Sequence, residues 1–259
     1  MADFLDVLAQ DAKETIRRGY YEVPTRTLVA SISLKRAIMT SKNAPVITEI
    51  KAASPSAGVI RQNLEAAELA RAMEKGGAVG ISVLTEPTHF QGSLNSLAEA
   101  LKAVKLPILM KDIILSPVQI DAASKVGANA VLLIQALFDR GHCEFSLKEM
   151  ITEAHSKNLE VLLETHNEDE FRSAVDTDVD LAGINNRDLG KLKVDLDVTR
   201  RILENNDAKG KIIVSESGIN TPVDIHFLHA CGAHAFLIGS AIMQVDNVEE
   251  KVKEFVHAL

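Results

Sequence analysis

Residues 46–77 read VITEIKAASPSAGVIRQNLEAAELARAMEKGG, and this stretch decides the fold. It begins with a short run rich in Val and Ile, which is typical of a strand buried on both faces. After a loop, apolar residues recur at helical spacing, as at Leu69 and Met73, and predict an amphipathic helix. Gly76 and Gly77 stand where that helix should end. The stretch is therefore one strand–loop–helix unit.

The same unit recurs along the rest of the chain and predicts a (β/α)8 TIM barrel, an α/β fold. Expected strands begin near Val46, Gly80, Pro107, Asn129, Leu159, Leu181, Lys211 and Ala235. Expected helices occupy 64–77, 93–104, 116–127, 145–157, 167–176, 195–206, 221–232 and 247–259. An open doubly wound sheet would have fewer strands and a GxGxxG turn after its first strand, whereas KAASPSAG (51–58) follows here.

The residues before the first strand form a separate feature, because residues 1–44 show helical patterns around Leu5–Arg18 and Thr25–Thr40. We expect this N-terminal helical extension to pack near the barrel mouth. No linker or change of composition divides the chain, and a barrel needs about 250 residues. Residues 1–259 are therefore predicted to form a single (β/α)8 barrel domain.

Composition narrows the possible partners. The chain has no Trp, only two Tyr and a formal net charge of −8, which argues against binding to nucleic acid or to an anionic membrane surface. A small phosphorylated substrate remains compatible with this charge. The two cysteines match no metal or redox spacing, and the N-terminus lacks the pattern of a signal peptide. We expect a cytoplasmic protein that is a monomer or weak oligomer.

Several strands end on polar residues where a buried strand would normally have none. Parallel strands deliver their carboxyl ends to one face of a barrel, so these side chains should meet at its mouth. In four of these strands the polar residue lies two positions after an inward apolar residue, as Lys111 follows Leu109. Charged groups of both signs at one barrel mouth should shift each other's pKa values. We therefore favour a role in acid–base catalysis over a purely structural ion-pair network. The candidate catalytic residues are Glu49, Lys51, Lys111, Glu164, Asn185 and Glu216.

The last two strands are followed by a predicted phosphate site. SESG (215–218) follows the seventh strand and IGSAI (238–242) follows the eighth, and the loops at these places commonly bind phosphate in barrels. Gly218 and Gly239 lack a Cβ atom, so an anion can approach their backbone N–H groups. Ser240, and Ser54 in the first loop, can add hydroxyl groups.

Other candidates are weaker. His226 and His229 share one expected outer helix without a third ligand, so no metal site is predicted there. His166 follows Glu164 at a strand end and is expected to be an exposed loop histidine. Phe90, in the loop after the second strand, can form part of a pocket wall that packs against a ring.

Eight segments in this order resemble indole-3-glycerol-phosphate synthase of tryptophan biosynthesis, from about residue 45 to the C-terminus. They are VITEIKAASPS, SVLTEPTHFQGS, ILMKDIILSPVQI, AVLLI, EVLLETH, GINNRDL, VSESGI and FLIGSAIM. The resemblance implies a carboxy-lyase that closes the indole ring of 1-(2-carboxyphenylamino)-1-deoxyribulose 5-phosphate with loss of CO2 and water. It implies no cofactor and no metal.

The resemblance also implies a role for each candidate catalytic residue. Lys111 is implied to polarise and protonate the substrate ketone, and Lys51 to lie near the substrate carboxylate and supply a proton in dehydration. Glu164 is implied to act as acid or base when the hydroxyl is lost. Asn185 and Glu216 are implied to orient groups around the reacting chain, and Glu49 to brace the lysines.

The implied substrate-binding residues form a second group. Ser217 would support the sugar chain, and Phe90 with Leu132 would line the anthranilate pocket. The phosphate would be held by Ser54, Gly218, Gly239 and Ser240.

The chain departs from the family in two places. Ile113 stands where a Phe often follows the Lys-Asp pair, which implies an aliphatic pocket wall. Ala52, Ala53 and Ala57 occupy a loop that usually carries basic residues. Contacts to the substrate carboxylate are therefore expected to be fewer, or to come from the N-terminal extension.

Two alternatives stay open at this point. One is another phosphate-binding barrel enzyme, either of the phosphoribosylanthranilate isomerase or of the tryptophan synthase α type. An isomerase would want a Cys/Asp pair at the mouth, and neither Cys143 nor Cys231 ends a strand. The other is a non-catalytic barrel that binds a phosphorylated ligand. That function would not explain why the charged strand ends lie together at one barrel mouth.

Overall fold

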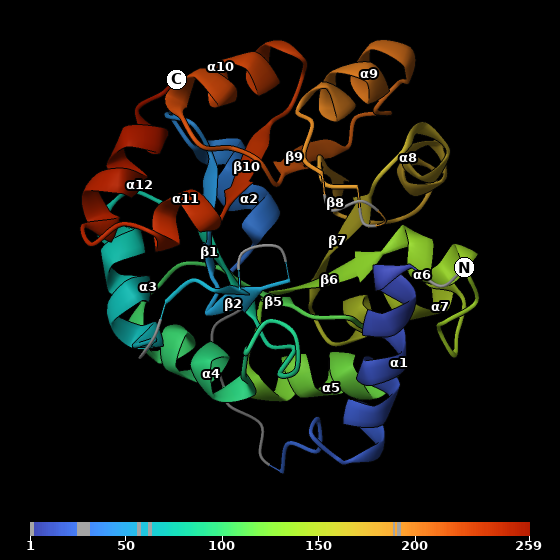
Figure 1. Cartoon of the computed structure of the whole chain (residues 1–259). Coiled ribbons are helices and arrows are strands. Elements are labelled where there is room, and N and C mark those ends of the chain that lie inside the picture. Colours follow the sequence, from blue (N-terminus) through green and yellow to red (C-terminus); the bar gives the residue numbers. More distant parts are fainter. Residues whose placement is uncertain (1–2, 25–31, 56–57, 62–63, 189, 191–192) are drawn as a thin grey trace.

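Eight parallel strands form a closed barrel in the order β1-β10-β9-β8-β7-β6-β5-β4, with β4 paired to β1 (Figure 1). The computed structural model describes residues 3–24, 32–55, 58–61, 64–188, 190 and 193–259. The barrel confirms the predicted α/β fold class, and each strand begins within one residue of its expected start. The barrel strands are β1 (Val46–Ile50), β4 (Gly80–Leu84), β5 (Ile108–Lys111), β6 (Ala130–Ile134), β7 (Glu160–Thr165), β8 (Leu181–Asn185), β9 (Ile212–Glu216) and β10 (Ala235–Ile238).

The helices that surround the barrel lie within the segments expected to be helical. They are α3 (Ala66–Lys75), α4 (Leu94–Ala103), α5 (Pro117–Val126), α7 (Leu147–Ser156), α8 (Glu168–Val175), α9 (Asp197–Asn205), α10 (Pro222–Ala230) and α12 (Val248–Val256). The sequence did not predict α6 (Gln135–Asp139), α11 (Ser240–Met243) or the hairpin of β2 (Ala53–Ser54) and β3 (Gly58–Val59). These elements are too short for periodicity to identify. Among the described residues, none of the helices is both long and apolar enough to cross a membrane.

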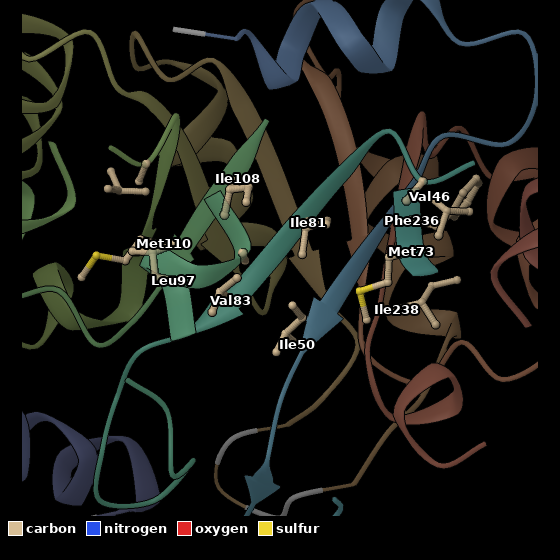
Figure 2. Close-up of a cluster of buried hydrophobic side chains, with 14 of the residues drawn as sticks. Val46, Ile50, Met73, Ile81, Val83, Leu97, Ile108, Met110, Phe236 and Ile238 are labelled. Atoms are coloured by element: carbon tan, nitrogen blue, oxygen red, sulfur yellow. The ribbon is translucent and has the colours of Figure 1, made fainter. Parts of the chain in front are cut away.

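Strand parity divides the buried side chains into an outer and an inner core. On the outer face, Ile50 of β1 and Val83 of β4 belong to a cluster that also contains Met73 of α3 and Leu97 of α4 (Figure 2). Burying each such side chain contributes roughly 1.5–3 kcal/mol. The opposite parity fills the barrel with Ile47, Leu109, Leu132, Leu162, Val214 and Leu237. A residue two positions beyond one of these therefore also points inward, but at the mouth.

The N-terminal extension contacts both ends of the barrel. Helix α1 (Phe4–Arg17) contributes Phe4, Leu5 and Leu8 to the cavity at the mouth. Helix α2 (Leu34–Thr40) lies at the opposite end, where the backbone N–H of Lys35 donates to Glu160 at the start of β7.

The expectation that the whole extension packs at the mouth is therefore wrong for α2. Leu34 packs against Gly80 at the start of β4, and Leu34 and Ile38 join the inner core. These apolar side chains close the lower end of the barrel, which would otherwise expose the inner core to water. Residues 25–31 of the predicted second helix lie outside the described residues.

Candidate active site

The carboxyl ends of the strands surround a cavity of about 280 Å³. Every residue of the predicted site except Glu216 lines this cavity: Glu49, Lys51, Ser54, Phe90, Lys111, Leu132, Glu164, Asn185, Ser217, Gly218, Gly239 and Ser240. Glu216 is fully buried and lies beside Lys111 instead. The structure therefore brings the predicted residues together from all eight barrel units, with Glu216 just behind the cavity wall.

The charged strand ends form one continuous cluster centred on Lys111. The Lys111 Nζ atom lies 3.2 Å from Glu49 Oε2, 3.2 Å from Glu216 Oε2 and 4.0 Å from Glu164 Oε2. Lys51 Nζ lies 2.8 Å from Glu49 Oε1. The lysine side chains retain 13–16% of their exposure, whereas the three carboxylates retain 1–4%. The two ammonium groups are thus the charged groups that a ligand in the cavity meets first.

These contacts set the charge state of the first two strand ends. Burial alone would lower the pKa of Lys111, but Glu49, Glu216 and Glu164 outweigh it and raise that pKa above its ordinary value. Burial alone would raise the pKa of Glu49, but Lys111 and Lys51 outweigh it and hold that pKa at about 2. Lys111 is accordingly a permanent ammonium group at neutral pH, and Glu49 is an ionised carboxylate that pairs with it.

Glu164 and Glu216 both contact Lys111, yet their environments give them different pKa values. Burial alone would raise the pKa of Glu164, but His166 and Lys111 outweigh it and lower that pKa to about 2. Burial raises the pKa of Glu216 to about 7, with Glu164 adding to the rise and Lys111 opposing it. Two neighbouring carboxyl groups whose pKa values are driven apart can serve as a base and an acid.

The predicted phosphate loops have the tight backbone that their glycines suggested. Ser217 and Gly218 both have positive φ angles, of 67° and 85°. A Cβ atom on Gly218 would lie 2.2 Å from Val194 Cγ1, and one on Gly239 would lie 2.5 Å from Glu49 Oε1. Only glycine fits either position without displacing a neighbour, so both loops present bare backbone to the cavity.

A buried amide holds the loop after β9 in this shape. The Asn186 Nδ2 atom donates to the carbonyls of Glu216 and Ser217, at 3.0 and 3.1 Å, and to Ser215 Oγ at 3.0 Å. Its Oδ1 atom accepts from the Thr199 hydroxyl at 2.8 Å and from the Thr199 N–H at 3.2 Å. The network ties the end of β8, the end of β9 and α9 to the loop that carries Gly218.

We expect Asn186→Ala to lower the free energy of unfolding by about 2–3 kcal/mol, because it leaves several buried donors and acceptors unpaired. Urea denaturation of both proteins measures this loss. Asn95→Ala is a matched control, since Asn95 is exposed and bonds only to Glu99 on its own helix among the contacts described. A change below about 0.5 kcal/mol in Asn186→Ala, as expected for a surface site, would contradict the role of this network.

Apolar side chains form a further wall of the cavity. Phe90 and Leu132 face the cavity with Ile113, so the expected aliphatic residue is part of this wall. The carboxylate of Glu86 accepts the N–H groups of His89 and Phe90, at 2.7 and 3.0 Å, and so fixes the Phe90 turn.

An ion pair and two histidine–carboxylate contacts with the barrel loops hold α1 over this wall. Asp3 Oδ1 lies 2.6 Å from Arg140 Nη1, Asp6 Oδ1 lies 2.9 Å from His142 Nε2, and Asp11 Oδ2 lies 2.7 Å from His89 Nε2. Exposed pairs of this kind each contribute no more than about 1 kcal/mol. The apolar contacts of Leu5 and Leu8 therefore provide most of the attachment.

Sequence reasoning missed several residues of the cavity. Arg187 lines it two positions after Asn185, and its strand-end spacing was a signal that could have identified it. Phe4, Leu5 and Leu8 were not recognisable, because helical periodicity shows an apolar face but not which cavity it covers. His166 was expected to be exposed, which is wrong: its side chain is 11% exposed and lies 3.1 Å from Glu164 Oε1.

The structure also bears on the expected carboxylate contacts. The residues of α1 that line the cavity are apolar, so the described extension supplies no cation there. Arg187 and Lys51 are the cationic side chains at that wall besides Lys111. Ala52 directly precedes β2, Ala53 is the first residue of β2, and Ala57 lies outside the described residues.

Comparison with known sequences gives a consistent result. The model of the family described as "IGPS: Indole-3-glycerol phosphate synthase" matches residues 6–255. An indole-3-glycerol phosphate synthase of Methanocaldococcus jannaschii is 46% identical over 233 residues, covering 87% of this chain and 83% of the relative. One from Caldanaerobacter subterraneus is 38% identical over 260 residues and covers 97% of both chains.

Two solved structures share the fold at low sequence identity. Thiamine phosphate pyrophosphorylase from Pyrococcus furiosus superposes with a TM-score of 0.60 and 16% identity, covering 86% of this chain and 96% of that one. N-acetylmannosamine-6-phosphate 2-epimerase from Clostridium perfringens also gives 0.60 and 16%, covering 83% and 93%. Both likenesses concern the barrel alone.

Proposed function

The chain belongs to the indole-3-glycerol phosphate synthase family, and from this premise we propose how its side chains divide the reaction. The enzyme converts 1-(2-carboxyphenylamino)-1-deoxyribulose 5-phosphate into indole-3-glycerol phosphate, CO2 and water. The ring carbon that bears the carboxylate attacks the ketone, CO2 leaves, and dehydration then completes the indole.

The observation that carries the proposal is the Lys111 ammonium group, which faces the cavity while three carboxylates hold it from behind. Lys111 donates a hydrogen bond to the substrate ketone and stabilises the negative charge that develops on this oxygen during ring closure. Its raised pKa keeps the group charged. Preorganised charge of this kind acts mainly in the transition state.

Lys51 and Arg187 hold the substrate carboxylate on the other side of the reacting carbon. Both line the same cavity, and Lys51 is itself oriented by Glu49 at 2.8 Å. The carboxylate must leave as neutral CO2. Lys51 and Arg187 therefore need to orient it before the reaction and to remain in place when CO2 departs. Lys51 also remains a proton source for the dehydration.

The two carboxyl groups with separated pKa values take opposite parts in dehydration. Glu164, ionised at neutral pH, accepts the proton that the substrate carbon releases. Glu216, with a pKa near 7, keeps a proton that it can supply in this step, and it orients Lys111. Asn185 completes this wall and aligns the sugar chain.

The remaining predicted residues bind the two ends of the substrate. Phosphate lies against the backbone of Gly218 and Gly239 with the Ser240 and Ser54 hydroxyl groups, and Ser217 supports the sugar chain. Phe90 and Leu132 pack against the anthranilate ring. The phosphate-binding residues and the ring-binding residues line the same cavity, which supports this orientation of the substrate.

The partners follow from the same premise. The ligand is a small phosphorylated substrate. We further propose that residues 1–259 act as one domain, as a monomer or weak oligomer in the cytoplasm, without cofactor or metal and without binding to nucleic acid or membranes.

The purified chain, incubated with the carboxyphenylamino-deoxyribulose phosphate, should show the growth of indole fluorescence together with one CO2 per indole formed. Equal amounts of both products are required because decarboxylation and ring closure belong to one reaction. CO2 without indole fluorescence, or no turnover while the substrate still binds, would contradict the proposed reaction.

A further inference from the structure

A mostly buried histidine lies between the active-site carboxylate Glu164 and a second acidic residue outside the cavity. His166 Nε2 lies 3.1 Å from Glu164 Oε1, and His166 Nδ1 lies 3.2 Å from Glu170 Oε2. The same Glu170 oxygen accepts the backbone N–H of His166 at 2.8 Å. Each nitrogen of the imidazole ring therefore lies within 3.2 Å of a carboxylate oxygen, and the Nδ1 contact has the geometry of a hydrogen bond.

The local chain geometry explains this arrangement. Glu164 points into the barrel mouth from β7, and His166 lies two residues later, where the chain leaves the strand for α8. Glu170 lies in the first turn of α8, four residues after His166, and its side chain reaches back over the helix start. Strand end and helix start thus present two carboxylates to one ring.

We propose that His166, held by Glu170, is a positioning residue that keeps Glu164 ionised and aimed into the cavity for its work as a base. This inference rests on the proposed function, because it gives Glu164 a part in the dehydration. In that step the hydroxyl group takes a proton from Lys51 and leaves as water, and the carbon-bound proton passes to Glu164 and then to solvent.

The charge count at the mouth supports this role. At neutral pH Glu49 and Glu164 are ionised and Glu216 is partly ionised, so the carboxylates of the inner cluster carry more charge than its two lysines, Lys51 and Lys111. Lys111 sits closer to Glu49 and Glu216, at 3.2 Å each, than to Glu164, at 4.0 Å. The imidazolium of His166 supplies the missing charge to Glu164 and leaves Lys111 available to the substrate.

The charged surroundings of His166 come from several elements. On the mouth side they are the cluster already described. On its other side His166 and Glu170 border a second cavity whose charged residues are Asp3, Arg140, Asp188, Lys193, Asp195 and Arg201. These six carry three charges of each sign, so the two carboxylates in direct contact dominate. Burial alone would lower the pKa of His166, but Glu164 and Glu170 outweigh it and raise that pKa to about 9.

The direction of the pKa shift predicts how the stability depends on pH. The pKa of His166 in the folded protein, about 9, lies above its ordinary value of 6.5. The ion pairs therefore stabilise the fold fully below pH 6.5, and this contribution is lost as the pH rises through 9. Replacing His166 with a neutral residue should remove this part of the pH dependence.

The decisive experiment compares kcat as a function of pH for the wild type, His166→Gln and His155→Gln. Without the imidazolium, the pKa of Glu164 rises, so the acidic limb of the profile should move to higher pH by about one unit or more, and kcat at a given pH on that limb should fall about tenfold. KM should stay within about twofold, since the phosphate loops are untouched. His155→Gln is the matched control, because His155 is exposed on α7 and pairs with Asp180 away from the cavity.

A profile for His166→Gln that keeps the wild-type acidic limb, with kcat within twofold, would overturn the inference. A uniform drop in kcat without a shift of the limb would also overturn it, because that result indicates a merely structural role. The variant must be shown to fold by circular dichroism at each pH.

A second measurement does not depend on turnover. Imidazole ¹⁵N signals of His166 should titrate near pH 9 in the wild type and at clearly lower pH in Glu170→Gln. Titration near 6.5 in both proteins would sink the ion-pair arrangement. If the wild type failed to form indole but His166 still titrated near pH 9, the proposed function would be wrong. The contacts of His166 with Glu164 and Glu170 would still be supported.

Discussion

Lys111→Met should lower kcat by about 10²–10⁴-fold while KM changes only a few-fold, because the ammonium group acts mainly on the oxygen that becomes negative in the transition state. Methionine keeps the length and the apolar stem of the side chain. Steady-state kinetics of the wild type and the variant on the same substrate, followed by indole fluorescence, give both constants.

Removing Lys111 also leaves Glu49 and Glu216 without their shared cation. Breaking a buried ion pair typically costs about 3–5 kcal/mol, although protonation of Glu216 offsets part of this cost. The melting temperature and product binding of the variant therefore need to be measured beside its turnover. Lys125→Met is a suitable control, since Lys125 pairs with Asp121 on the outer helix α5.

Lys51→Met provides the comparison that assigns the two lysines. If Lys51 mainly holds the substrate carboxylate, its loss should raise KM more than the loss of Lys111 does. Turnover of Lys111→Met within a few-fold of the wild type would contradict the assignment and make Lys51 the better candidate for the group that acts on the ketone.

Ser240→Asp should raise KM by about 100-fold or more. A carboxylate at this position would stand beside the substrate phosphate, and two like charges 4 Å apart near a protein surface repel by about 4 kcal/mol. Ser240→Asn is a matched control, because it has nearly the same shape without the charge. The kinetics of both variants, with inorganic phosphate as a competitive inhibitor, test the site directly.

The contrast between the two Ser240 variants carries the test. The asparagine variant should keep KM within about tenfold of the wild type, and phosphate inhibition should weaken far more in the aspartate variant. Equal KM values for Asp and Asn would place the phosphate elsewhere. Gly239 is less suitable for this purpose, since a Cβ atom there would also meet Glu49 and Lys51.

The barrel itself could be predicted from the sequence because its signals are local. An apolar run of four or five residues followed by an amphipathic segment identifies each unit, and eight consecutive units leave few alternatives to a closed barrel. Parity within strands, as in Leu109 and Lys111, predicted which side chains enter the mouth. The short α6 and α11 gave no comparable signal, because one helical turn has no periodicity.

Contacts between distant segments were beyond this reasoning. The apolar residues of α1 and α2 look alike in the sequence, yet Leu8 covers the mouth and Leu34 closes the opposite end. The difference depends on where the chain can bury each face, which the local pattern does not contain. His166 was expected at the surface for the same reason. Its partner Glu170 contacts it only because α8 begins at Glu168, which puts Glu170 in the first turn of the helix.

The sequence by itself determined the order of the units, the inward parity of the strands and the kinds of side chain that meet at the mouth, because these follow from spacing along one chain. Only the tertiary structure decided which charges neighbour one another. Glu164 and Glu216 follow similar apolar strands, but one lies beside His166 and the other is buried behind Lys111, so their pKa values separate to about 2 and about 7. Electrostatic interactions depend on distance and burial in three dimensions, and that physical fact makes one carboxyl group a base and the other an acid.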